Sequence, residues 1–121
     1  MKRFLWLLIV SSGWVTPSIS QDTALAKIGA TVIAHQPAST QQYIGSPSIA
    51  VLLDGDYVAS HDLFGPGSSE FTQAITRVYR SSDRGRTWSK VSEIRGAFWS
   101  SLFVHHGKLY LLGPDRHHGT V

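Results

Sequence analysis

Short apolar runs separated by turn residues fill the chain after residue 45. Asp54-Gly55-Asp56 has the chemistry of a hairpin turn, and a Gly-Pro-Gly sequence marks a loop after Phe64. The runs between these breaks are too short for helices and show no helical periodicity. The pattern therefore predicts four antiparallel strands, at residues 48–53, 57–61, 74–80 and 90–94.

The same pattern then starts again. Residues 101–105, a His106-Gly107 turn and residues 108–112 repeat the order of the first hairpin, and Gly107 follows Gly55 by 52 positions. Four short strands that recur at about 40–50 residues are typical of β-propeller blades. A β-sandwich is the alternative, because the chain holds little more than one repeat. The fold class is predicted as all-β.

The chain before residue 43 divides into two parts. Lys2 and Arg3, an apolar run over residues 4–10 and a Ser18-Ile19-Ser20 motif form the layout of a secretory signal peptide over residues 1–20. A membrane anchor is the alternative, but this run has about half of the ~20 residues needed to span a bilayer. We expect a secreted or periplasmic protein with no membrane span after cleavage. Residues 21–42 form an N-terminal segment with one expected strand at residues 30–34.

Composition narrows the possible partners. Removal of the signal takes away two of 11 Lys and Arg against eight Asp and Glu, so the formal charge falls from +3 to +1. No cluster of basic residues remains that would indicate nucleic acid. Two His-His pairs suggest a metal, but neighbouring strand residues point to opposite faces and no other ligand spacing supports zinc. We expect neither a metal nor a cofactor, and the oligomeric state is not indicated.

The stretch between the third and fourth strands is a polar turn that ends on a tryptophan, Ser81-x-Asp83-x-Gly85-x-Thr87-Trp88. The Ser81 and Asp83 oxygens can accept hydrogen bonds from nearby backbone N–H groups, and Gly85 permits a positive φ. Trp88 can fold under the turn and close the edge of the core. Stacking of Trp88 on a sugar is the alternative to this structural role.

This octet resembles the Asp-box, or BNR repeat, of the sialidase (neuraminidase) superfamily. Residues 43–55 are similar to the segment that opens the first sialidase blade, and residues 57–62 are similar to its second strand. The resemblance covers residues 43–121 and implies the N-terminal fragment of a propeller, six-bladed when complete. Residues 43–95 would be the first blade and residues 96–121 part of the second. The Asp-box also occurs in propellers that are not enzymes.

Two departures from the family bear on the substrate. The positions of two family arginines hold Gly45 and Phe64, which cannot make the bidentate pairing of arginine with a carboxylate. The resemblance therefore implies an exported glycoside hydrolase with a substrate other than an ordinary sialoside. A non-catalytic propeller that binds a carbohydrate or a protein is the alternative, and an inactive truncated product is a third.

Alternation of the strand connections divides the loops between two ends. The turns at Gly55, Gly107 and residues 81–88 should share one end, and the resemblance places the pocket at the other. Asp62 and Glu70 are the candidates for acid/base catalysis, and carboxylates with aromatic rings suit a sugar. Asp62 can instead cap a turn, and histidines here can be ordinary hydrogen-bonded loop residues. The expected substrate-binding residues are Tyr43, His61, Phe64, Trp99, Arg116 and His117, in a mouth that would also contain Asp115 and His118.

Overall fold

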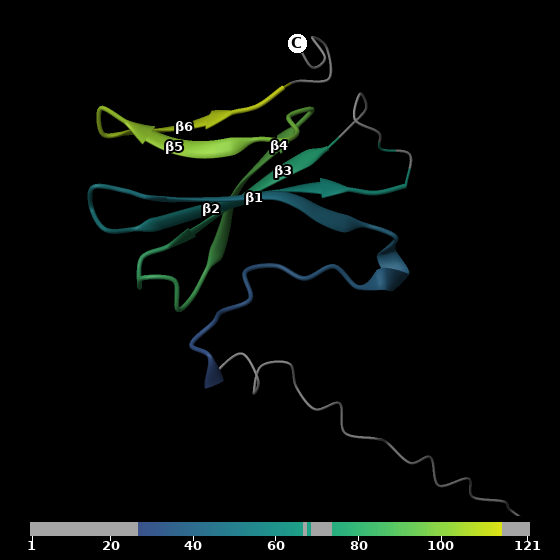
Figure 1. Ribbon diagram of the computed structural model, residues 1–121, viewed down its shortest axis with the longest axis horizontal. Helices are drawn as coiled ribbons and strands as arrows, with labels where there is room; N and C mark the ends of the chain where they lie inside the picture. Colours follow the sequence, from purple (N-terminus) through teal and green to yellow (C-terminus); the bar gives the residue numbers. More distant parts are fainter. Residues whose placement is uncertain (1–26, 67, 69–73, 115–121) are drawn as a thin grey trace, which may run out of the picture.

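The structure, a computed structural model, describes residues 27–66, 68 and 74–114. A four-stranded antiparallel sheet runs in chain order through β1 (Tyr43–Val51), β2 (Tyr57–Phe64), β3 (Ile75–Ser81) and β4 (Ser89–Arg95). A separate hairpin, β5 (Ser101–His105) and β6 (Lys108–Leu112), lies beside this sheet (Figure 1). A short 3-10 helix, Ala38–Thr40, precedes β1. The all-β prediction is confirmed, and the described ranges contain antiparallel sheets only.

The predicted hairpins are present. Gly55 and Gly107 both have a positive φ, 88° and 72°, as their turns require. The first two strands differ from their predicted bounds: β1 begins at Tyr43 and ends at Val51, and β2 continues past residue 61 to Phe64. A bulge between Gly45 and Ser48 interrupts the pairing of β1 with β2, and the Ser46-Pro47 pair inside the bulge masked the start of β1 in the sequence.

The prediction of a strand at residues 30–34 is wrong. These residues pair with no strand in the described part of the chain. Ile33 and Ala34 instead lie over the face of the β1–β3 sheet, where they line a hollow. Packing on a sheet face covers apolar side chains. It does not require the backbone to align with an edge strand, as a hydrogen-bonded ladder does.

The hairpin β5–β6 packs on the opposite face of the sheet. Val58, Val78 and Leu102 form the buried cluster between them. Two side chains of the sheet also accept hydrogen bonds from the backbone of the hairpin segment: Ser48 Oγ from Leu102 N at 2.9 Å, and Asp62 Oδ2 from Ser100 N at 3.2 Å. Because β5 is not paired with the sheet, these bonds fix its position.

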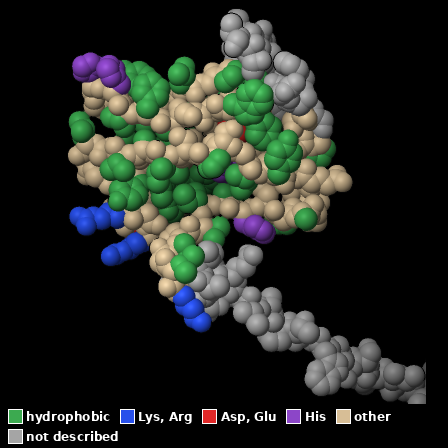
Figure 2. Space-filling view, in the orientation of Figure 1, with side chains coloured by type: hydrophobic (Ala, Val, Ile, Leu, Met, Phe, Trp, Pro, Cys, Tyr) green, Lys and Arg blue, Asp and Glu red, His purple; other side chains and the backbone are tan. Residues whose placement is uncertain are grey.

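The outer faces of both sheets are partly apolar. Ile49 and Val51 are exposed on β1, and Phe103 stacks on Tyr110 on the outer side of the hairpin, with ring centroids 5.3 Å apart. On the face in view, Figure 2 shows hydrophobic side chains gathered over the sheets. Apolar side chains are therefore exposed on the outer faces as well as buried between the sheet and the hairpin.

The turn between β3 and β4 is held by its own side chains. Ser81 Oγ accepts a hydrogen bond from Gly85 N at 2.8 Å, and Asp83 accepts from the backbone and hydroxyl of Thr87 at 2.9 and 2.7 Å. The Trp88 indole donates to the Gly85 carbonyl at 3.0 Å, and Gly85 has φ 85°. These bonds agree with the turn expected from the sequence, although Trp88 is only partly buried.

The acidity of Asp83 makes the stability of this turn depend on pH. The Thr87 hydroxyl, the Thr87 N–H and the Ser81 hydroxyl lower the pKa of Asp83 from its ordinary 3.8 to about 2. A lowered pKa in the folded state contributes stability above the unfolded pKa, and this contribution is lost as the pH falls. We expect the melting temperature to drop between about pH 4 and pH 2 partly through Asp83. In Asp83→Asn this part of the drop should be absent, and an unchanged pH profile would contradict the assignment.

Candidate functional site

The two ends of the sheet differ as expected. Arg80 pairs with Asp56 at 2.6 Å and with Asp54 at 3.1 Å, which links the β1–β2 turn to the start of the 81–88 turn. A side chain at Gly107 would lie 3.2 Å from Leu53, so the β5–β6 turn is at the same end. Gly65 and Ala74, which flank the connection between β2 and β3, and the 96–100 crossover are therefore at the opposite end, which we call the loop end.

At the loop end, Phe64 forms the centre of an aromatic group. Tyr43 stacks on Phe64 with centroids 5.3 Å apart and an angle of 14° between the rings. Phe64 is buried with Phe98, and Phe98 meets Trp99 edge to face at 5.5 Å. Tyr43 and Trp99 at the two ends of this series are 58% and 48% exposed. The loop end therefore offers two aromatic side chains to solvent on a buried aromatic base.

The Phe64 ring lies directly against Gly45. A Cβ atom at residue 45 would lie 2.8 Å from Cε2 of Phe64, closer than such atoms approach in proteins. The Phe64 ring thus occupies the space that a side chain at residue 45 would need. The family resemblance expects arginines at positions 45 and 64. The Phe64 ring takes up the space beside Gly45, and Gly45 has no side chain that would compete for this space.

We expect Gly45→Ala to lower the free energy of unfolding by about 1–3 kcal/mol, because the added methyl group overpacks a buried ring. Denaturant unfolding would measure this loss. In a Phe64→Leu background the same substitution should be less damaging, since the smaller side chain leaves room. Equal losses in both backgrounds would show that Phe64 does not fill this space.

Trp99 lies in a strained part of the crossover. Its φ is 50°, a left-handed conformation that is rare for a bulky side chain. Such a residue is disfavoured by about 1–3 kcal/mol and persists only where its surroundings fix it. The neighbouring residues Phe98 and Ser100 are buried, so the backbone on both sides of Trp99 is held in place.

Asp62 is fully buried, with 0% exposure, between the sheet and the crossover. Its Oδ1 accepts a hydrogen bond from the Thr76 hydroxyl at 2.6 Å, and its Oδ2 accepts from Ser100 N at 3.2 Å. The carboxylate thus links β2, β3 and the 96–100 crossover by hydrogen bonds. This role is structural, like the capping role that is the alternative to catalysis. The catalytic assignment of Asp62 stays a prediction, and in this conformation the residue has no surface for a substrate.

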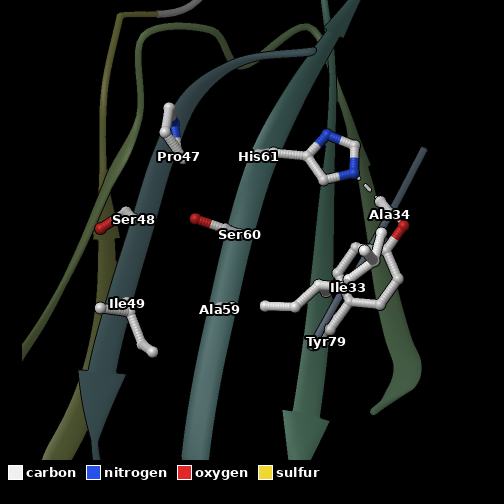
Figure 3. A pocket seen from close by; sticks show the side chains of 10 residues that line it. Ile33, Ala34, Pro47, Ser48, Ile49, Ala59, Ser60, His61 and Tyr79 are labelled. Atoms are coloured by element: carbon white, nitrogen blue, oxygen red, sulfur yellow. Dashed lines mark hydrogen bonds between the residues drawn. The ribbon is translucent and has the colours of Figure 1, made fainter. Parts of the chain in front are cut away.

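His61 faces the opposite side of the sheet from Asp62, because neighbouring strand residues alternate. Its Nε2 shares a hydrogen bond with the Tyr79 hydroxyl at 3.3 Å, and the two rings stack 5.5 Å apart. Figure 3 shows this pair beside Ile33 and Ala34, at a hollow of about 390 Å³. Desolvation lowers the pKa of His61, and the charge of Arg77 acts in the same direction. The structure therefore does not bring His61 into the aromatic loop end.

Tyr79 is the residue that sequence reasoning missed at this hollow. It follows from strand alternation: in neighbouring antiparallel strands Tyr79 pairs with Ala59, two residues from His61 on the same face. Of the remaining expected site residues, Glu70, Arg116 and His117 lie outside the described residues, as do Asp115, His118 and the expected signal peptide.

Comparisons with protein-family models, curated proteins and solved structures give no match to this chain. Among the described residues, no set of three or more His, Asp or Glu side chains is grouped as a metal site would require. That same part of the chain has no helix with the length and apolar character to cross a membrane.

Proposed function

We propose that this protein is an exported propeller of the sialidase type that recognises a neutral carbohydrate at the loop end. The observation that carries the proposal is the contact between Phe64 and Gly45, with Tyr43 stacked on the ring. An aromatic surface without a guanidinium group suits the C–H face of a sugar ring better than a carboxylate. The hydrogen-bonded turn at residues 81–88 supports the Asp-box interpretation, with the role of a scaffold.

Recognition of the carbohydrate can serve either hydrolysis or binding alone, and the burial of Asp62 favours binding alone. A general acid must reach the glycosidic oxygen at hydrogen-bond distance, whereas the Asp62 carboxylate is enclosed by Thr76 and Ser100. Glu70 is the other carboxylate proposed for acid/base work. Release of nitrophenol from neutral nitrophenyl glycosides would separate a hydrolase from a binding protein.

The test of the site uses two tyrosines with the same local packing. Tyr43 stacks on Phe64 at the loop end, and Tyr110 stacks on Phe103 on the hairpin; both pairs have centroids 5.3 Å apart and an angle of 14°. In the full chain, Tyr43→Ala should weaken binding of neutral methyl glycosides about tenfold, since stacking contributes about 1 kcal/mol or more. Tyr110→Ala should leave the affinity unchanged.

Methyl glucoside, methyl galactoside and methyl N-acetylglucosaminide are suitable probes, with N-acetylneuraminic acid as the charged comparison. Tighter binding of the acid than of all three neutral sugars would overturn the proposal. Equal losses in Tyr43→Ala and Tyr110→Ala would place the binding surface elsewhere.

A further inference from the structure

The crossover between β4 and β5 exposes one residue and buries its neighbours. Trp99 is about half exposed, while Phe98 and Ser100 on either side are 1% and 2% exposed. Trp99 also has the left-handed φ of 50°. Trp99 meets the buried Phe98 ring edge to face, but about half of Trp99 itself stays outside the core. An outlier of this kind points to function when the surroundings hold it in place.

Hydrogen bonds to buried groups hold the crossover on both sides of Trp99. The Thr76 hydroxyl lies 2.6 Å from Asp62 Oδ1 and 3.3 Å from the Ala97 carbonyl, and Ser100 N donates to Asp62 Oδ2. Phe98 N donates to the Pro114 carbonyl at 3.2 Å. The Asp62 carboxylate thus links β2, one of the two inner strands of the sheet, to the residue that follows Trp99.

We propose that Asp62 is a positioning residue that fixes Trp99 as a preformed platform for the apolar face of a neutral sugar ring. This inference rests on the proposed carbohydrate function and assigns Asp62 a role other than acid catalysis. A platform that is rigid before binding loses less conformational entropy when the ligand arrives. The sugar is expected to be neutral because Phe64, next to Phe98 in the same cluster, supplies a ring where a charge would be needed.

The proposed role depends on hydrogen-bond geometry and not on charge. An asparagine at position 62 should therefore position Trp99 as well as the aspartate does. Its oxygen can accept from Ser100 N, while its amide donates to the Thr76 hydroxyl, which can turn its own hydrogen to the Ala97 carbonyl. An alanine at this position has neither group. The pair Asp62→Asn and Asp62→Ala therefore separates positioning from acid catalysis.

The first readout needs no ligand. In the full chain, acrylamide quenching of Trp99 is obtained as the difference between proteins with and without Trp99→Phe. Asp62→Asn should keep the wild-type quenching of Trp99, and Asp62→Ala should change it. Unchanged quenching in a folded Asp62→Ala would overturn the positioning role.

The second readout is affinity for the three neutral methyl glycosides. We expect Asp62→Asn to stay within about threefold of wild type, and Trp99→Ala to weaken binding about tenfold. If Asp62→Ala does not fold, Asp62→Asn still separates hydrogen-bond geometry from charge, and Trp99→Ala still tests the platform. Loss of binding in a folded Asp62→Asn would show that the charge is required and would overturn the inference. Full affinity in Trp99→Ala, with loss in Tyr43→Ala, would leave the proposed function standing and remove the platform. Failure of the wild-type chain to bind any of the three sugars would overturn both.

Discussion

Replacing Phe98 by alanine should lower the free energy of unfolding by about 3–5 kcal/mol, the range for truncation of a buried aromatic side chain. Phe98 is 1% exposed and packs with Phe64 and Ala74 at the loop end. Its removal leaves a cavity under the crossover, and the hydrogen-bonded residues around it cannot collapse into the space without breaking their bonds. Denaturant unfolding of wild type and variant at equal protein concentration would measure the loss.

Phe103 provides the matched control for Phe98. It is an aromatic residue of the next strand, but 43% of its surface is exposed and its main partner is the Tyr110 ring. Phe103→Ala should therefore lower the free energy of unfolding by only about 1 kcal/mol. Similar losses in the two variants would contradict the assignment of the loop-end cluster as a core.

The strands could be predicted from the sequence because their turns and their periodicity agree. Gly55 and Gly107 stand where a left-handed backbone is needed, and the apolar runs on either side have the length of strands. The 81–88 turn could be predicted for the same reason, since its oxygens reach backbone groups only two to four residues away. Local chemistry was sufficient for these turns and for the presence of the strands, but not for the start of β1 at Tyr43 or the end of β2 at Phe64.

Other features depend on contacts between distant residues. Whether residues 30–34 join a sheet depends on the edge or face that is available to them, and this is not encoded in their own pattern. The contact between Gly45 and Phe64 arises from the pairing of β1 with β2. The separation of His61 from Asp62 follows from strand alternation and could have been recognised in the sequence.

Trp88→Ala is the second large effect that we expect, at the end of the molecule opposite the proposed site. The indole donates to the Gly85 carbonyl at 3.0 Å, and its ring lies 3.7 Å from the position of a Cβ on Gly85. Because Trp88 is only partly buried, the expected loss of about 2–3 kcal/mol is below that of a fully buried aromatic. Thermal or denaturant unfolding would measure it.

Trp88→Phe divides this loss into its parts. A phenylalanine keeps most of the apolar contact with the turn but lacks the N–H, so it should lose about 1 kcal/mol, the usual net contribution of one hydrogen bond. Affinity for neutral methyl glycosides should be unchanged in either variant that folds, because the 81–88 turn and the loop end are at opposite ends of the same strands. A folded Trp88→Ala protein that no longer binds these sugars would move the binding site to the turn and make Trp88 itself a stacking surface.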